Sequence, residues 1–189
     1  MSEIEPTARL FFALWPSESM QTALADSVST LVDPAKCRPV PASNFHLTLA
    51  FLGSVELGRV ASLHELAARC VTSCPPSTLP LVVDLDRFEY WRRPHILCAT
   101  ASSTPPAISA FARTLKRALT AEGFAPDMKP FRAHATFARK VHGSEDRLQA
   151  IPVRWTFDAL HLIESDTHPD GSIYRAVASW RLGSSSARA

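Results

Sequence analysis

The sequence is short of the features that mark several common protein classes. Its formal net charge is only +2 at pH 7, which is too small to identify a nucleic-acid-binding protein from bulk charge. It has four cysteines and no C-x-x-C pair, so it predicts neither a zinc site nor a disulfide framework. No apolar run is long enough to span a membrane. The acidic start lacks the basic and long apolar parts of a secretory signal. We therefore expect a cytoplasmic protein with reduced thiols and no membrane association.

The remaining composition is that of an ordinary soluble protein. Of its 189 residues, 46% are apolar and 20% are charged, and this is enough for a sizeable core that needs no metal or disulfide. Arginine supplies most of the 20 basic residues. Arginine favours bidentate phosphate contacts, but an arginine-rich proteome produces the same composition.

Apolar periodicity predicts an α+β protein with the element order βαβαββαβββ. The expected helices cover residues 17–31, 56–71 and 105–122, and Ser17 is the expected N-cap of the first. The expected strands cover residues 9–15, 45–52, 79–90, 95–100, 133–139, 155–164 and 173–182. The first strand–helix–strand unit resembles a later one, which favours two lobes facing each other across a cleft. We expect one domain over residues 1–182 and a flexible tail over residues 183–189.

Two tetrads contain the candidate catalytic residues. His46-Leu47-Thr48-Leu49 and His134-Ala135-Thr136-Phe137 each have the form His-x-Thr-apolar on an expected strand. Because side chains alternate along a strand, each histidine shares a face with the threonine two residues later. Seven histidines and 13 threonines would give about 0.5 such pairs by chance. The pattern alone therefore leaves open that both histidines are ordinary polar residues on a solvent-facing sheet.

Paired histidines suit the opening of a cyclic phosphodiester. Water needs a base to remove its proton, and the departing ribose oxygen needs an acid. Two imidazoles near their ordinary pKa of about 6.5 can divide these roles at neutral pH. Threonine hydroxyls can donate hydrogen bonds to the non-bridging phosphate oxygens.

Arg139 follows the second tetrad and is a candidate for a fixed positive charge. Strict alternation places it on the face opposite His134, so it reaches the site only if the strand ends or bulges near Ala138. The alternative is a surface arginine paired with Glu145 or Asp146. A second basic group, Tyr90-Trp91-Arg92-Arg93, is either an RNA-contacting cluster or a plain hairpin end.

At these residues the chain resembles the two-histidine phosphoesterases, most closely the RNA 2′,3′-cyclic phosphodiesterases historically called 2′-5′ RNA ligases. The resemblance rests on RLFFALWP, NFHLTLAFLG, HATFAR, ALHLIES and YRAVASWRL, and it covers nearly the whole chain. The second motif departs from the family's frequent Pro-His-Ile-Thr-Leu, which puts cleft width and substrate preference in doubt more than catalysis.

The resemblance implies a bilobal fold with a central cleft and metal-independent hydrolysis of RNA 2′,3′-cyclic phosphate ends to 2′-phosphates, without a cofactor. It implies that His46 and His134 are the acid–base pair, with His46 most often the acid. Thr48, Thr136 and Arg139 would bind phosphate. Phe51 matches an aromatic residue near the nucleobase, although its expected inward direction favours core packing equally. The expected partner is an RNA with a cyclic phosphate end, such as a tRNA fragment, or a nucleotide, and the expected state is a monomer.

Three other functions remain open at this point. One is a phosphodiesterase of a small cyclic nucleotide or 2′-5′ oligonucleotide, and reversible 2′-5′ RNA ligation uses the same chemistry. Another is a non-catalytic nucleotide- or RNA-binding module. The third is a metal-dependent hydrolase, which is weakened because neither tetrad contains a carboxylate.

Overall fold

The computed structural model describes residues 5–143, 147–168, 171–183 and 187–188. The three α-helices are α1 (Glu18–Val28), α2 (Val60–Thr72) and α3 (Pro106–Ala121). The first six strands are β1 (Thr7–Leu14), β2 (Arg38–Pro39), β3 (Leu47–Glu56), β4 (Leu81–Leu85), β5 (Arg87–Trp91) and β6 (Ile96–Thr100). The other six are β7 (His134–Arg139), β8 (Arg147–Leu148), β9 (Val153–Phe157), β10 (Ala159–His168), β11 (Gly171–Arg181) and β12 (Ala187–Arg188).

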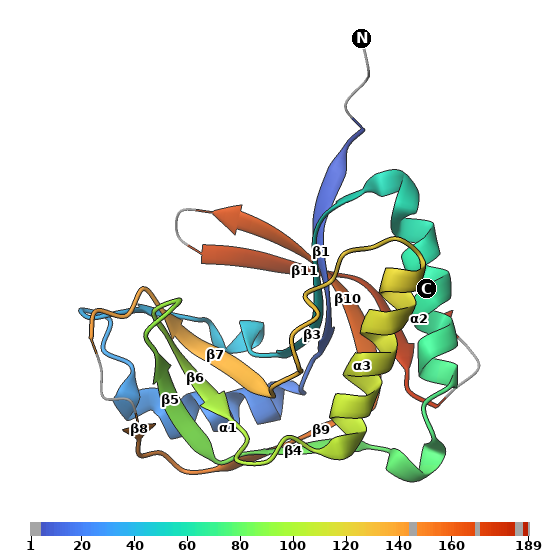
Figure 1. The fold of residues 1–189 in the computed structure, drawn as a ribbon. Coiled ribbons are helices and arrows are strands. Elements are labelled where there is room, and N and C mark those ends of the chain that lie inside the picture. The colour runs from blue at the N-terminus through green and yellow to red at the C-terminus, as the bar shows by residue number, and fades with distance from the viewer. Residues whose placement is uncertain (1–4, 144–146, 169–170, 184–186, 189) are drawn as a thin grey trace.

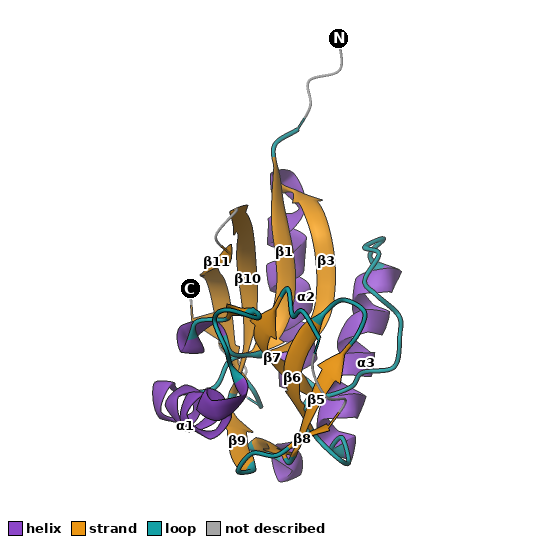
Figure 2. Cartoon of the chain, turned by 90° about the vertical axis from the view of Figure 1, so that its left-hand side faces the viewer, coloured by secondary structure: helices purple, strands orange, loops and turns teal. Residues whose placement is uncertain are grey.

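Two five-stranded sheets form two lobes, as the expected α+β bilobal fold requires. The first sheet has the order β12-β11-β10-β1-β3 and the second has the order β2-β7-β6-β5-β8. Every strand pair described is antiparallel. Figure 1 shows the second sheet at the left and the first at the centre, and the turned view in Figure 2 separates the same two groups of strands. The two histidine tetrads therefore belong to different lobes.

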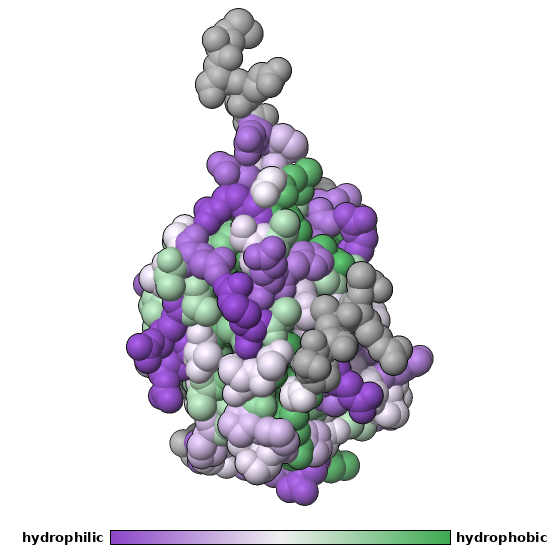
Figure 3. All heavy atoms as spheres, turned by 90° about the vertical axis from the view of Figure 1, so that its right-hand side faces the viewer, coloured by the Kyte–Doolittle hydropathy of each residue, from purple (hydrophilic) through white to green (hydrophobic). Residues whose placement is uncertain are grey.

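Helices α2 and α3 lie side by side and cover one face of the first sheet (Figure 1). Their apolar stripes include Leu63 and Leu66 on α2 and Leu115 and Leu119 on α3, all of which are buried. The outer surface of this helical layer carries many hydrophilic side chains (Figure 3). With one face of the sheet covered in this way, the opposite face remains for the cleft.

The expected helices are confirmed with small changes at their ends. Ser17 caps α1, because its Oγ accepts a hydrogen bond from the backbone N–H of Met20 at 3.4 Å. The third helix begins at Pro106, as favoured by a proline in the first turn. The second begins as a short 3-10 turn over Leu57–Arg59 before α2.

Two strands predicted as continuous are each divided in two, which corrects the predicted element order. The segment 79–90 splits at Asp86 into β4 and β5, and the segment 155–164 splits at Asp158 into β9 and β10. β4 and β9 then pair with each other in a separate two-stranded sheet. These breaks let one stretch of chain serve two sheets, an outcome of tertiary pairing that apolar periodicity does not report.

Near the C-terminus, β12 pairs with β11 through Ala187 and Arg188. Residues 184–186 and 189 lie outside the described residues, so the flexibility of the 183–189 tail stays a prediction. In the part of the chain that is described, no helix combines the length and the apolar character needed to cross a bilayer.

Candidate functional site

His46 lies immediately before β3 and is fixed by two hydrogen bonds. Its Nδ1 lies 2.6 Å from the carbonyl oxygen of Asn44. A carbonyl only accepts, so Nδ1 must carry the proton, and Nε2 is left as the reactive nitrogen. The hydroxyl of Thr48 lies 3.1 Å from that Nε2. The first tetrad therefore presents one imidazole nitrogen and one hydroxyl at the same point, as predicted from alternation.

His134 begins β7 and is held in the same way. Its Nδ1 lies 2.9 Å from the carbonyl oxygen of Arg132, again two residues earlier in the chain. This bond again places the proton on Nδ1 and leaves Nε2 for chemistry. Both His134 and Thr136 are partly exposed, whereas Ala135 between them is buried. The two lobes thus orient their histidines by one shared local device.

Aromatic rings surround His46. Trp15 stacks on the imidazole with centroids 4.8 Å apart and planes 4° apart. Phe11 lies 5.1 Å away, and Tyr174 approaches edge-on at 5.3 Å. Beside His134 lies the ring of Trp91, with centroids 4.9 Å apart. These contacts fix both imidazole planes and make the surroundings of His46 the more apolar of the two.

The environment lowers the pKa of both histidines. Burial is the main cause for His46, and it outweighs the Asn44 carbonyl to bring the pKa to about 4, with the charges of Arg139 and His134 adding to the effect. Burial also lowers the pKa of His134, against its bond to the Arg132 carbonyl and together with the charges of Arg132 and Arg139. Charged groups of the second lobe therefore influence His46 in the first, so the structure brings the two tetrads to one site.

A β-bulge decides the direction of Arg139. Thr136 faces Cys98 and Ala138 faces Leu97, so Phe137 is the extra residue on β7. Phe137 and Ala138 are both buried, and Arg139 returns to the partly exposed face of His134 and Thr136. The sequence predicts that Arg139 reaches the site only if the strand bulges near Ala138, and this bulge is present. Glu145 and Asp146, the alternative partners of Arg139, lie outside the described residues.

Two cavities border Arg139. One of about 470 Å³ extends toward Asn44 and Tyr174 of the first lobe. The other, of about 440 Å³, is lined by basic groups that include Arg38, His95 and Lys140. Arg139 therefore lines both cavities, one that reaches residues of the first lobe and one rich in basic groups, and such surroundings suit an extended anion.

The direction predicted for Phe51 from strict alternation is wrong. Thr48 faces Ala13 and Ala50 faces Phe12, so a bulge at Leu49 shifts the following residues. Phe51 consequently shares the cleft face with Thr48 and is 37% exposed. The guanidinium of Arg9 lies 4.6 Å from its ring centroid. Phe51 is thus not a core residue, and its ring is partly exposed on the face of β3 that carries Thr48.

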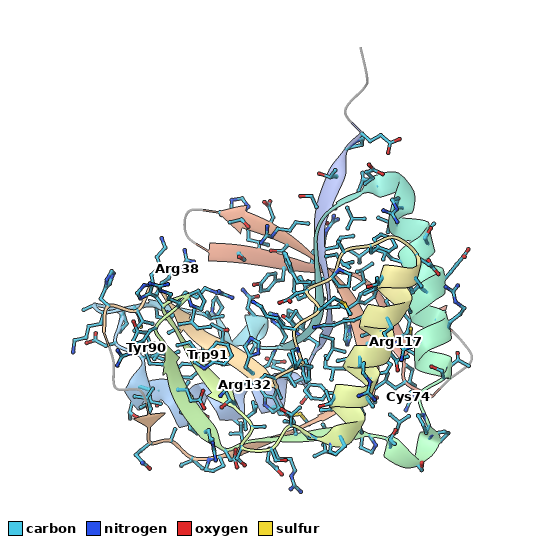
Figure 4. All side chains as sticks on the ribbon, in the orientation of Figure 1. Arg38, Cys74, Tyr90, Trp91, Arg117 and Arg132 are labelled. Atoms are coloured by element: carbon cyan, nitrogen blue, oxygen red, sulfur yellow. The ribbon has the colours of Figure 1, made fainter. Side chains whose placement is uncertain are left out.

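Sequence reasoning missed most of the aromatic surroundings. Apolar density predicts a buried strand over residues 9–15, but Phe11, Ala13 and Trp15 project on the cleft side together with Tyr174. Their period-two spacing is the signal that the sequence offers. Trp91 belongs to the suspected aromatic–basic cluster, and the structure places it against His134 in the second lobe (Figure 4).

The described residues contain no group of three or more His, Cys, Asp or Glu side chains placed to hold a metal ion. Within that part of the chain, the four cysteines are free and buried. In both histidines, Nδ1 is already engaged by a backbone carbonyl, so each imidazole offers one nitrogen. The arrangement can exchange protons at two points and hold an anion between them.

Comparison with known proteins identifies the family. The sequence model of the 2′-5′ RNA ligase superfamily matches residues 20–169. The RNA 2′,3′-cyclic phosphodiesterase of Escherichia coli strain K12 is 31% identical over 131 residues, covering 69% of this chain and 71% of that protein. The enzyme of the same name from Geobacillus stearothermophilus is 32% identical over 117 residues, covering 60% of this chain but only 37% of that protein.

Solved structures share the fold. E. coli LigT complexed with 3′-AMP has a TM-score of 0.81 and 24% identity, covering 95% of this chain and all of that one. TT0787 of Thermus thermophilus has a TM-score of 0.77 and 24% identity, covering 93% of this chain and 98% of that one. The fold, the paired tetrads and the match of the family model over residues 20–169 agree, and the chain belongs to the 2′-5′ RNA ligase superfamily.

Proposed function

We propose that this protein hydrolyses RNA 2′,3′-cyclic phosphate ends to 2′-phosphates, with His46 and His134 as the acid–base pair. The observation that carries the proposal is the matched pair of imidazoles, one from each lobe, each with Nδ1 bound to a carbonyl, which leaves Nε2 for proton exchange, beside the Thr48 hydroxyl in the case of His46. The relatives from E. coli and G. stearothermophilus, named as RNA 2′,3′-cyclic phosphodiesterases, support the substrate class.

In the proposed reaction, one histidine accepts a proton from water as its oxygen attacks phosphorus. The bond from phosphorus to the 3′ oxygen breaks, and the other histidine donates a proton to that oxygen. The products are a 2′-phosphate and a free 3′ hydroxyl. Positioning and charge stabilisation supply most of the catalysis of such displacements.

The hydroxyls of Thr48 and Thr136 are assigned to the non-bridging oxygens, and Arg139 supplies a fixed positive charge. All three side chains lie on the faces that carry the histidines. A bound phosphate anion also raises the pKa of both imidazoles, because each is then next to a negative charge. The substrate itself thus restores the protonated histidine that the acid role requires.

Two arguments assign the acid and base roles to the two histidines in opposite ways. The resemblance to the family gives the acid role to His46. The lowering of its pKa to about 4 favours the neutral ring, and hence the base role, in the free protein. Substrates whose leaving group needs no acid can decide between the two.

The direct test is hydrolysis of a short RNA ending in a 2′,3′-cyclic phosphate, with EDTA present. His46→Ala and His134→Ala should each lower kcat at least about a hundredfold. His64→Ala is the control, because this histidine lies on α2 against Trp180 and should remain near wild type. A folded wild-type protein that binds nucleotide without hydrolysing it would instead indicate a binding module. Loss of activity on adding EDTA would indicate a metal-dependent hydrolase.

A cleft that accepts nucleotides is supported by LigT of E. coli, whose structures include complexes with 3′-AMP, NADP⁺ and ATP. Activity on a cyclic mononucleotide, compared with that on RNA, would separate a small substrate from an RNA end. The monomeric state and the cytoplasmic location stay predictions.

A further inference from the structure

Glu89 on β5 is a mostly buried carboxylate that binds Trp91 and Arg132. It accepts a hydrogen bond from the indole Nε1 of Trp91 at 2.8 Å. One guanidinium nitrogen of Arg132 lies 2.9 and 2.6 Å from its two carboxylate oxygens. Burial alone would raise the pKa of Glu89, but the bond from Trp91, the charge of Arg132 and the bonds from Thr100 and Arg132 together outweigh it and lower the pKa. Glu89 is therefore ionised at neutral pH and holds Trp91 and Arg132.

Trp91 and Arg132 both contact His134. The ring of Trp91 lies 4.9 Å from the imidazole, and the carbonyl of Arg132 accepts its Nδ1–H. The Arg132 guanidinium in turn lies 5.0 Å from the centroid of the Trp91 ring, and Figure 4 shows these two side chains together. The four residues form a closed set of contacts with the carboxylate at one end and the imidazole at the other.

We propose that Glu89 is a positioning residue for His134. The proposal rests on the proposed function, because it concerns the orientation of one histidine of the acid–base pair. Arg132 lies just before β7, so sheet pairing does not hold its carbonyl, and its side chain is 53% exposed. Without the carboxylate, both the carbonyl and the indole that define the imidazole plane lose their tether.

The contrast with the first lobe explains why such a device is needed there. Three aromatic rings pack around His46, and the plane of that imidazole is fixed by packing. Trp91 is the aromatic contact described for His134, and the carboxylate bond to its indole nitrogen adds the second constraint. Small errors in the position of a reacting group are costly, with about 1 Å worth about a hundredfold in rate.

The test is Glu89→Gln, which keeps the size of the side chain and removes its charge. We expect kcat on the cyclic phosphate RNA to fall about tenfold to thirtyfold, with KM within about twofold. Trp91→Phe keeps the ring and removes the indole donor, and it should lower kcat about threefold to tenfold. Because both changes break one tether, the double variant should be little worse than Glu89→Gln alone.

Glu164→Gln is the matched control. Glu164 also pairs with an arginine, Arg175, and its side chain is 28% exposed against 19% for Glu89. It lies in the first lobe on β10, and its loss should leave kcat and KM within about twofold of wild type. Unfolding temperatures of the two variants should fall by similar amounts, which separates positioning from stability.

A spectroscopic measurement tests the tether without relying on turnover. Imidazole ¹⁵N shifts of His134 should show a proton fixed on Nδ1 in the wild type and a mixture of the two neutral forms in Glu89→Gln. Unchanged shifts together with wild-type kcat in Glu89→Gln would overturn the proposal, as would fully additive losses in the double variant. If the wild type proves inactive on cyclic phosphate ends, the proposed function fails, yet the shifts still report whether Glu89 orients His134.

Discussion

The segments 44–51 and 132–139 share one backbone design and end in side chains of opposite character. In each, the histidine donates Nδ1–H to the carbonyl two residues earlier. In each, a large apolar residue and an alanine follow the threonine and form a buried bulge, Leu49-Ala50 in one lobe and Phe137-Ala138 in the other. The next residue is Phe51 in the first lobe and Arg139 in the second.

This difference teaches how the two lobes divide one site. The first lobe contributes apolar surface, since Phe11, Trp15, Tyr174 and Phe51 lie on its cleft side. The second contributes charge, since Arg132 and Arg139 both act on the pKa of His134. Shared backbone geometry places the chemistry symmetrically, and the unequal side chains suit a substrate with a base at one side and phosphate at the other.

The largest expected difference between the lobes concerns the leaving group. A cyclic substrate with sulfur in place of the 3′ oxygen expels a thiolate, which needs no proton from an acid because a thiol has a pKa of only about 8.5. The alanine variant of the acid histidine should recover to within about tenfold of wild type on this substrate, while the other stays about a hundredfold down. Steady-state kinetics of His46→Ala and His134→Ala on both substrates measure this. Equal recovery of the two variants would contradict a division into acid and base.

Substitutions of Arg139 and Phe51, the last residues of the two segments, should change different kinetic constants. Arg139→Met should lower kcat about thirtyfold to a hundredfold, because a charge-assisted contact to the reacting phosphate is worth about 2–3 kcal/mol. Phe51→Leu should raise KM about fivefold to thirtyfold with little change in kcat, because base stacking contributes binding at about 1–2 kcal/mol. A loss of kcat in Phe51→Leu as large as that in Arg139→Met would remove the distinction between the lobes.

The two threonines should behave alike. Thr48→Val and Thr136→Val each remove one hydrogen-bond donor while keeping the shape, so each should lower kcat about tenfold. Thr48→Ser and Thr136→Ser retain the hydroxyl and should stay within about threefold of wild type. Initial rates at saturating substrate give the comparison. Valine variants with full activity would show that neither hydroxyl binds the transition state.

The last expected effect is on stability and not on activity, and it belongs to the first lobe. The pKa of His46 is about 4 in the folded chain, against about 6.5 when unfolded. The unfolded state therefore binds the proton first, and stability should fall by up to about 3 kcal/mol as pH drops from about 6.5 to 4. His46→Gln should lose this part of the pH dependence. Urea unfolding at pH 7 and pH 4.5 measures it, and identical pH dependence in variant and wild type would contradict a lowered pKa.

The features that could be predicted from the sequence are those determined by residues close together in the chain. The helices follow from apolar stripes and caps such as Ser17. The pairing of His46 with Thr48, and of His134 with Thr136, follows from alternation within three residues. The repeated strand–helix–strand unit favoured two lobes facing a cleft, and the resemblance to a known family implied the same arrangement.

The features that sequence reasoning missed depend on partners far along the chain. Phe51 turns outward because β3 bulges where it pairs with β1. A leucine at position 49 does not predict a bulge, since leucine is common in regular strands too. The strands break at Asp86 and Asp158 because β4 and β9 leave to pair with each other. The bonds from His46 and His134 go to backbone carbonyls, which every residue possesses, so no residue type marks them.

The bulges also determine which kinds of sequence change each segment can accept. A substitution at Leu49 or Phe137 that straightened the strand without removing a residue would reverse the face of everything that follows on that strand. Arg139 would then turn into the apolar interior, and Phe51 would do the same in the other lobe. Deletion of the extra residue together with its bulge would instead leave both side chains on their present face, because regular alternation then gives the same result. Engineering of this cleft should therefore keep each bulge, or remove it only together with its extra residue.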